Sequence, residues 1–205
     1  MNPVWLILLV GAVYVLLFGG LSLLRREGLS GRFALEAFVV TGLAGALVTL
    51  TGTPLSPILF LIVLYLITMR VRVLADLGNM LARRRDFRRA GQLYNLALNL
   101  WPDESGRLIV QVNQATALLE MGALDPSVVL FREILGKAGE GFLGVKYEAA
   151  AHFNLGVAYR RQHLDSQAIT EFNAVLDTWP SSEFARQAER ALQQVRASPH
   201  SPSNP

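Results

Sequence analysis

Hydrophobic residues follow two different patterns along this chain, and the change falls near residue 70. The first third holds three long apolar runs, which predict membrane helices at about residues 3–24, 33–51 and 55–73. Beyond them, apolar and polar residues alternate at helical spacing, which predicts amphipathic helices in a soluble domain over residues 70–197. We therefore expect an all-α protein whose N-terminal membrane domain covers residues 1–69.

The third apolar run is the least certain membrane crossing. Ser56 followed by Pro57 marks a helix start, and the uninterrupted apolar stretch from there to Met69 is short for a full crossing. Arg70 and Arg72 can extend their side chains toward the headgroups, which lengthens the buried segment. Two readings stay open: residues 33–69 span the bilayer twice, or they form a re-entrant hairpin.

The sequence also predicts how the third run continues. No Gly or Pro lies between Ile58 and Leu77, so nothing local ends a helix there. We expect one continuous helix that leaves the bilayer and becomes the first helix of the soluble domain. Standing upright, this helix would place Arg83 to Arg85 roughly 20 Å from the membrane, at 1.5 Å per residue.

Charge placement predicts the orientation of the membrane domain. Arg25, Arg26 and Arg32 lie between the first two apolar runs, and Arg70 and Arg72 follow the third. Basic residues favour the cytoplasmic side. We expect an integral protein of a plasma or inner membrane with its N-terminus outside and its soluble domain in the cytoplasm.

Two features of the second apolar run are candidates for a specific role. Glu36 lies near its start, where a carboxylate can reach the headgroups, although an acid within a membrane segment can also be functional. Gly42 and Ala46 form a small-xxx-small pair suited to close helix contact.

Two segments of the soluble part repeat the same pattern. LADLGNMLARRRDFRRAGQLYNLALNLWP and HFNLGVAYRRQHLDSQAITEFNAVLDTWP share Leu-Gly, then a small residue, an aromatic residue and Pro at equal spacing. A degenerate middle unit has Ala115, Ser127 and Phe131 at the matching places, with Gly122 at the turn. The matching positions of the two clear units are Leu77, Gly78, Ala90, Tyr94 and Pro102, and Leu155, Gly156, Ala168, Phe172 and Pro180.

The spacing has a physical reading as pairs of antiparallel helices. The small residues let the two helices approach closely, the aromatic residues fill the space beside them, and proline ends the second helix. The pattern resembles the tetratricopeptide repeat family, whose unit carries the same small, aromatic and proline positions. The resemblance implies a short α-solenoid with repeats at about 71–104, 108–141 and 149–182 and a capping helix at 183–197. The composition of SPHSPSNP predicts a disordered tail at 198–205.

In that family the first helices of successive repeats line a concave groove that binds protein partners. The basic clamp for carboxy-terminal peptides that some members carry is not reproduced here. By position, the resemblance implies a partner-binding groove formed by Asn79, Arg83, Val112, Asn113, Thr116, Glu120, Phe153, Asn154, Val157, Arg160 and Arg161.

Composition narrows the class of partner. Five arginines between Ala82 and Gly91 suggest nucleic-acid binding, but the chain from Ala90 onward carries nine basic residues against twelve acids. A nucleic-acid binder usually spreads basic charge over a whole face of its domain. We therefore interpret these arginines as a repeat turn that also helps to keep the domain on the cytoplasmic side, and we expect no nucleic-acid partner.

Little in the sequence suggests catalysis, a cofactor or a metal. GEGFLG, from Gly139 to Gly144, matches a dinucleotide fingerprint, but a helical pattern precedes it where that motif needs a strand. The three histidines share no metal-ligand spacing, and His152 is expected to pack. The chain has no cysteine.

These observations together predict a membrane-anchored interaction module, a scaffold, adaptor or assembly factor at the cytoplasmic face. The alternative is an auxiliary subunit of a membrane transport or enzyme complex, in which the repeats dock neighbouring subunits and Glu36 has a functional role.

Overall fold

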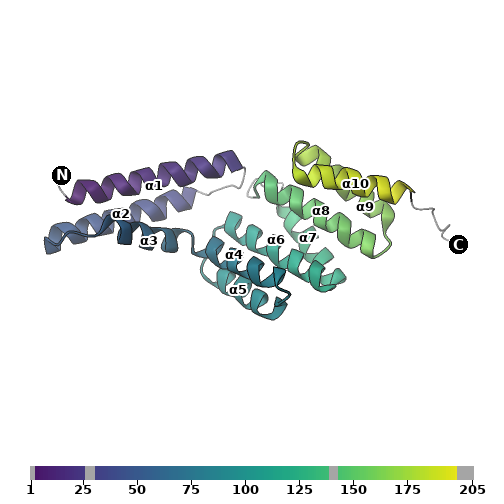
Figure 1. Ribbon diagram of the computed structural model, residues 1–205, viewed down its shortest axis with the longest axis horizontal. Coiled ribbons are helices and arrows are strands. Elements are labelled where there is room, and N and C mark those ends of the chain that lie inside the picture. The colour runs from purple at the N-terminus through teal and green to yellow at the C-terminus, as the bar shows by residue number, and fades with distance from the viewer. Residues whose placement is uncertain (1–2, 26–30, 139–142, 198–205) are drawn as a thin grey trace. The chain divides into compact units, whose positions relative to one another are not determined.

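A computed structural model describes residues 3–25, 31–138 and 143–197, and within these ranges all regular secondary structure is helical (Figure 1). The all-α class is confirmed. The predicted tail at 198–205 and most of the GEGFLG segment lie outside the described residues. The helices are α1 (Pro3–Arg25), α2 (Gly31–Thr51), α3 (Pro57–Thr68), α4 (Arg70–Arg83), α5 (Phe87–Asn99), α6 (Glu104–Met121), α7 (Leu124–Ala138), α8 (Val145–Arg161), α9 (Asp165–Thr178) and α10 (Glu183–Ala197).

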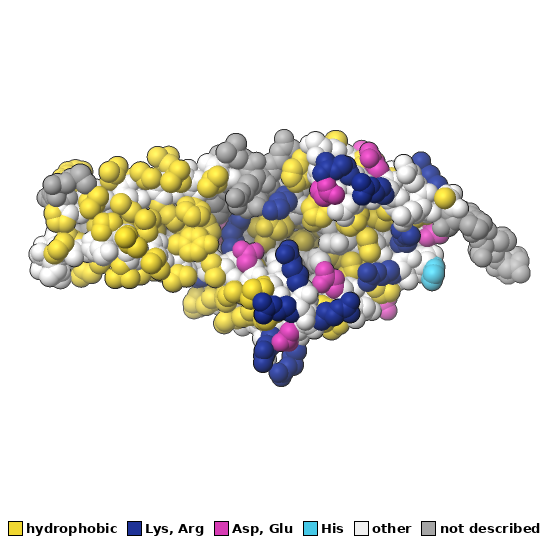
Figure 2. Space-filling model, in the orientation of Figure 1, with side chains coloured by type: hydrophobic (Ala, Val, Ile, Leu, Met, Phe, Trp, Pro, Cys, Tyr) yellow, Lys and Arg dark blue, Asp and Glu magenta, His cyan; other side chains and the backbone are white. Residues whose placement is uncertain are grey.

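The chain divides into two compact units, Met1–Val110 and Gln111–Pro205. The first unit holds α1 to α5, and α1 and α2 are each long and apolar enough to cross a membrane. A third crossing is present if α3 and α4 count as one bent span. The outer surface of α1, α2 and α3 is covered with hydrophobic side chains (Figure 2), as expected for helices that face lipid.

The three N-terminal helices share a core built from Ile7, Tyr14, Ala37, Phe60 and Leu64. A Cβ atom at Gly11 would lie 2.3 Å from Oγ1 of Thr41, so this glycine brings α1 and α2 close together. Within the described residues Gly42 makes no close helix contact, because a Cβ there would meet nothing within 4 Å.

The predicted continuous helix is also wrong. α3 ends at Thr68, α4 begins at Arg70, and the two axes meet at 76°. Met69 between them has φ −104° and ψ 9°, outside the helical region. The Arg70 guanidinium donates to the Ile67 carbonyl at 2.7 Å. A side-chain donor that enters the backbone ladder in this way is a known cause of a helix break. α3 therefore ends before residue 73, the predicted end of the third span.

Close contact between glycine and an aromatic ring holds α4 to α5 and, in the second unit, α8 to α9. A Cβ atom at Gly78 would lie 2.5 Å from the Tyr94 ring, and one at Gly156 would lie 2.7 Å from the Phe172 ring. The two helices of each pair can pack at this distance only because the residue facing the ring has no side chain.

The same turn ends the first helix of all three predicted units. Arg85, Gly122 and His163 have φ of 63°, 88° and 61°, in the left-handed region. The next residue in each case donates its backbone N–H to the carbonyl five residues back: Asp86 to Leu81, Ala123 to Leu118 and Leu164 to Tyr159, at 3.0, 2.9 and 2.9 Å. This is the hydrogen bond of a Schellman C-cap, so the three turns have one geometry.

The positions that follow these turns are also equivalent. Ala90, Ser127 and Ala168 are fully buried, and the aromatic residues four positions later, Tyr94, Phe131 and Phe172, are buried as well. In the second unit, the last helix, α10, packs on α8 and α9 with Ala188, Leu192 and Val195 inward. The predicted helix at 183–197 is confirmed.

Candidate functional site: the membrane junction and the first helices

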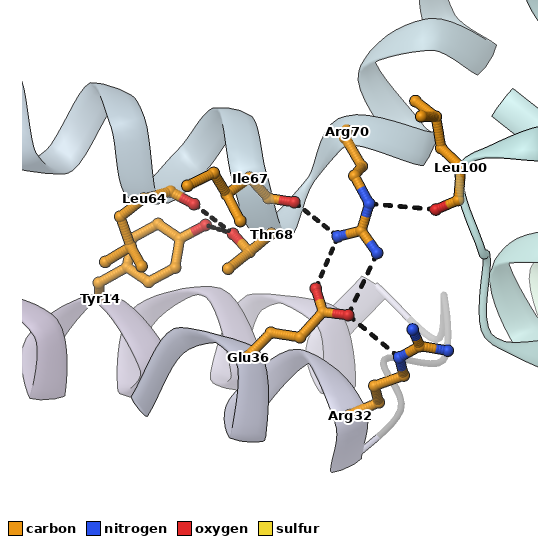
Figure 3. A network of polar contacts seen from close by, with 8 residues as sticks. All are labelled: Tyr14, Arg32, Glu36, Leu64, Ile67, Thr68, Arg70 and Leu100. Carbon is orange, nitrogen blue, oxygen red and sulfur yellow. Dashed lines mark hydrogen bonds and ion pairs between the residues drawn. The ribbon is translucent and has the colours of Figure 1, made fainter. Parts of the chain in front are cut away.

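The first candidate site is a polar junction at one end of the membrane helices. Arg70 donates from Nη1 to Oε2 of Glu36 at 2.6 Å and from Nη2 to Oε1 at 3.2 Å (Figure 3). Arg32, one turn before Glu36 on α2, donates to the same carboxylate at 3.0 Å. The Arg70–Glu36 pair is bidentate, which is the strongest and most directional form of an arginine–carboxylate contact.

Arg70 also contacts two backbone carbonyls. One belongs to Ile67, at the end of α3, and the other to Leu100, which follows α5 and accepts from Nε at 3.2 Å. One side chain therefore joins α2, α3 and the end of α5. Its position at the first residue of α4 fixes the direction in which the α4–α5 pair leaves the membrane helices.

A second polar contact supports the junction from inside the membrane bundle. The Thr68 hydroxyl donates to the Leu64 carbonyl at 2.7 Å and lies 2.6 Å from the Tyr14 hydroxyl. Because the Thr68 proton is used by Leu64, the Tyr14 hydroxyl is the donor between the two oxygens. This bond holds the last turn of α3 against α1, directly before the break.

A small pocket of about 50 Å³ opens beside these contacts. It is lined by side chains of α2, by the α3–α4 break and by the turn between α5 and α6, including Arg32, Phe33, Glu36, Arg70, Trp101 and Asp103. The pocket is large enough for water and too small for an organic ligand, so the junction is suited to positioning rather than to catalysis.

In the structure two arginines, Arg70 and Arg32, hold the Glu36 carboxylate. Reasoning from the sequence missed Arg70 as its partner. A signal was present, because the charge distribution already places residue 36 and residue 70 at the same side of the membrane.

The second candidate site is the set of residues predicted to line a groove. In the second unit α6 and α8 bring several of them together, because Asn154 Nδ2 donates to Thr116 Oγ1 at 3.1 Å. Arg161 donates to the Leu119 carbonyl at 2.9 Å, and Arg160 donates to the Gln194 side chain of α10 at 2.8 Å.

Other members of the set are used internally. Val112 is 2% exposed, and Phe153 stacks between the rings of Phe172 and Phe184, with centroids at 5.8 and 5.9 Å. In the first unit Asn79 accepts a 2.7 Å hydrogen bond from the Tyr94 hydroxyl. The side chains of Val112, Phe153 and Asn79 therefore hold helices together.

The remaining members lie at the surface to different degrees. Asn113 and Val157 are partly exposed, whereas Arg83, Glu120, Arg160 and Arg161 are exposed. Of the whole set, these four charged side chains have the best access to a partner. His152 was expected to pack, and it does so through a polar contact: its Nδ1 lies 2.7 Å from Oε2 of Glu171 on α9.

Comparison with protein-family models, curated proteins and solved structures finds no match to this chain.

Proposed function

We propose that this chain is a membrane-anchored protein-interaction module of the tetratricopeptide type, acting as a scaffold, adaptor or assembly factor at the cytoplasmic face of a plasma or inner membrane. The observation that carries the proposal is the threefold recurrence of one turn. The turns at Arg85, Gly122 and His163 share their backbone geometry, and each precedes a buried small residue and a buried aromatic residue at fixed spacing.

A recurrence of this kind favours a repeat architecture over an irregular helical domain. Repeats of two helices stack so that their equivalent helices form an extended surface, and such surfaces serve mainly to bind other proteins. In the second unit such a surface would include α6 and α8, which are joined by the Asn154–Thr116 hydrogen bond. Its exposed charges, Glu120, Arg160 and Arg161, have mixed sign, which favours a partner with both acidic and basic groups.

The junction at Arg70 supports an anchoring role for the membrane helices. Glu36 is the acidic residue that the alternative function, a transport or enzyme subunit, would require. Its carboxylate is held by Arg70 and Arg32, and the same arginine binds Leu100 of the first helix pair. A carboxylate in this position is suited to fixing a domain to its anchor.

Photo-crosslinking in native membranes tests the proposed interaction surface. A photoreactive amino acid is placed at Glu120 or Arg160, on first helices, and at Asn173 on α9 as an equally exposed control. The same partner should crosslink from the first two positions and not from Asn173. Crosslinking of equal yield from Asn173, or none from Glu120 and Arg160, would contradict the proposal.

Cysteine accessibility tests the proposed orientation, since the chain has no native cysteine. In intact cells, an impermeant maleimide should label Thr53→Cys, between α2 and α3, but should label Gln193→Cys on α10 only after lysis. Labelling of Gln193→Cys from outside would reverse the topology. Protection of Thr53→Cys in intact cells would favour the re-entrant hairpin.

A further inference from the structure

The break at Met69 changes where the basic end of the first helix pair lies. α4 has 14 residues and is therefore about 21 Å long. Because it leaves α3 at 76°, its far end advances only about 5 Å along the α3 axis. If α3 tilts by about 20°, a common value for membrane helices, the advance along the membrane normal ranges from about zero to about 12 Å. An upright helix would have advanced about 20 Å.

One face of α4 continues the surface that packs against the membrane helices. Val73 lies on this face and packs against the core of α1, α2 and α3. Leu77 and Met80, four and seven residues further along, fall on the same face of the helix. Both are exposed, by 42% and 44%, whereas Gly78 and Ala82 on another face are buried in the first unit.

The face therefore begins as protein core and ends as open apolar surface. Figure 2 shows hydrophobic side chains continuing from the membrane helices onto the adjacent edge of the α4–α5 pair, with arginines beyond them. Bulky apolar side chains at this level, next to the hydrocarbon-facing surface, have the bilayer itself as their nearest apolar medium.

Basic charge lies at the far end of the same face. Arg84 is eleven residues after Val73, about three turns, and so returns to that side of the helix. From Arg83 to Arg89 the chain carries five arginines against Asp86, and all five are exposed. With α4 close to the membrane plane, these charges come within about one Debye length, some 8 to 10 Å, of an anionic leaflet.

Trp101, between α5 and α6, adds an aromatic residue near the junction. Its side chain is 78% exposed, its φ of 48° is unusual for a residue with a side chain, and it lines the junction pocket beside Arg32 and Phe33. Phe33 and Arg32 stand at the first turn of a membrane helix, so Trp101 is placed at the level of the headgroups, where tryptophan is enriched.

We propose that the α4–α5 pair is seated on the surface of its own bilayer, in the headgroup region of a leaflet that contains anionic phospholipids. Leu77, Met80 and Trp101 enter the interface, and Arg84 and Arg85 contact lipid phosphates. The apolar surface of the membrane helices continues onto α4, and the far end of α4 is basic. Both features identify lipid as the partner that covers this face. The proposal stands apart from the protein-binding function, because it uses a different face of α4.

Spin labels on the full chain test this seating directly. Leu77→Cys, Met80→Cys and, as a control of similar chemistry and exposure in the second unit, Met121→Cys are labelled and reconstituted in nanodiscs. One set of discs contains phosphatidylcholine, and the other also contains phosphatidylglycerol. We expect labels at 77 and 80 to become accessible to oxygen and protected from a water-soluble nickel complex in the anionic discs, while the label at 121 stays accessible to the nickel complex.

Charge variants test the arginine contribution. One arginine near an anionic surface contributes about 1 kcal/mol, so Arg84→Gln should lower the ratio of seated to free pair roughly fivefold. Arg132→Gln, which removes an exposed arginine of α7, should leave that ratio unchanged. High salt should act in the same direction as Arg84→Gln.

Three results would overturn the proposal. The first is water-like accessibility at both 77 and 80 in anionic discs. The second is protection of both labels in detergent without a bilayer, which would mean that protein covers this face. The third is protection that appears only when a nucleic acid is added.

Discussion

Arg70 and Glu36 form a bidentate ion pair across 34 residues of sequence, and this pair coincides with the break between α3 and α4. Glu36 comes from a membrane helix, whereas Arg70 begins the first helix of the repeat pattern. The contact therefore determines how the α4–α5 pair is held at the end of the apolar helices, and its removal has a measurable cost.

We expect Arg70→Gln to destabilise the first unit by about 1.5 to 3 kcal/mol, the usual range for hydrogen bonds to a charged group. A cycle with Glu36→Gln should show strong coupling, because both variants lose the same contact. Thermal unfolding in nanodiscs measures both quantities. Lys137→Gln, which breaks the exposed Lys137–Glu133 pair at 3.4 Å, is the control and should change stability by less than about 0.5 kcal/mol. If Arg70→Gln and Lys137→Gln changed the stability equally, Arg70 would have no special role at the junction.

Gly78 should not tolerate a side chain. A methyl group there would meet the Tyr94 ring at 2.5 Å, so Gly78→Ala should destabilise the α4–α5 pair by about 1 to 3 kcal/mol through overpacking. Gly91→Ala on α5 is the matched control, because a Cβ there meets nothing within 4 Å. Its higher helix propensity should stabilise the pair by up to about 1 kcal/mol. Chemical denaturation measures the change in the free energy of unfolding for both variants. No change for Gly78→Ala would mean that the Tyr94 ring moves aside freely.

At the three equivalent turns, substitutions to glycine and from glycine should change the stability in opposite directions. Arg85 and His163 hold left-handed backbones that cost a residue with a side chain about 1 kcal/mol, so in detergent, where Arg85 has no lipid phosphate to contact, Arg85→Gly and His163→Gly should each stabilise the fold by up to that amount. Gly122→Ala should destabilise it by a similar amount, since φ there is 88°. The unfolding midpoints of the three variants test these expected changes in stability. Destabilisation by His163→Gly would show that its side chain contributes more than the backbone costs.

Glu183, at the start of α10, gives a prediction about pH. Hydrogen bonds from Arg186 and then Gln187 hold the pKa of this carboxyl below its ordinary value. A group with a depressed folded-state pKa contributes stability at pH above its unfolded value, and that contribution is lost as the pH falls through the folded value. Carbon-detected NMR should find a low titration midpoint for Glu183, and Arg186→Gln should raise it. An unchanged midpoint in the variant would exclude the arginine as the cause.

The repeat positions could be read from the sequence because their chemistry is local. The spacing of Gly78, Ala90 and Tyr94 recurs at Gly156, Ala168 and Phe172, and each glycine meets its ring within one helix pair. At the predicted middle unit Ser127 and Phe131 are buried, as the pattern predicts, since burial at those positions is a matter of register within two helices.

The membrane junction could not be read in this way, because tertiary contacts determine it. Nothing near Met69 in the sequence ends a helix, and the break is stabilised by bonds from Arg70 to Glu36 and Leu100, which are distant along the chain. The close approach of α1 and α2 could not be read from the Gly42–Ala46 pattern for a related reason. A small-residue motif does not say which face of α2 meets α1, and the close approach occurs at Gly11 and Thr41 instead.

The 76° angle between α3 and α4 has a mechanical consequence. In a straight helix, rotation about the long axis leaves the far end in place. Here the same rotation moves the far end of α4 sideways, because α4 lies at a large angle to the axis of α3. With an arm of about 21 Å, a 20° turn of α3 moves the tip by about 7 Å. Small rotations within the lipid would thus become lateral displacements of the domain along the membrane.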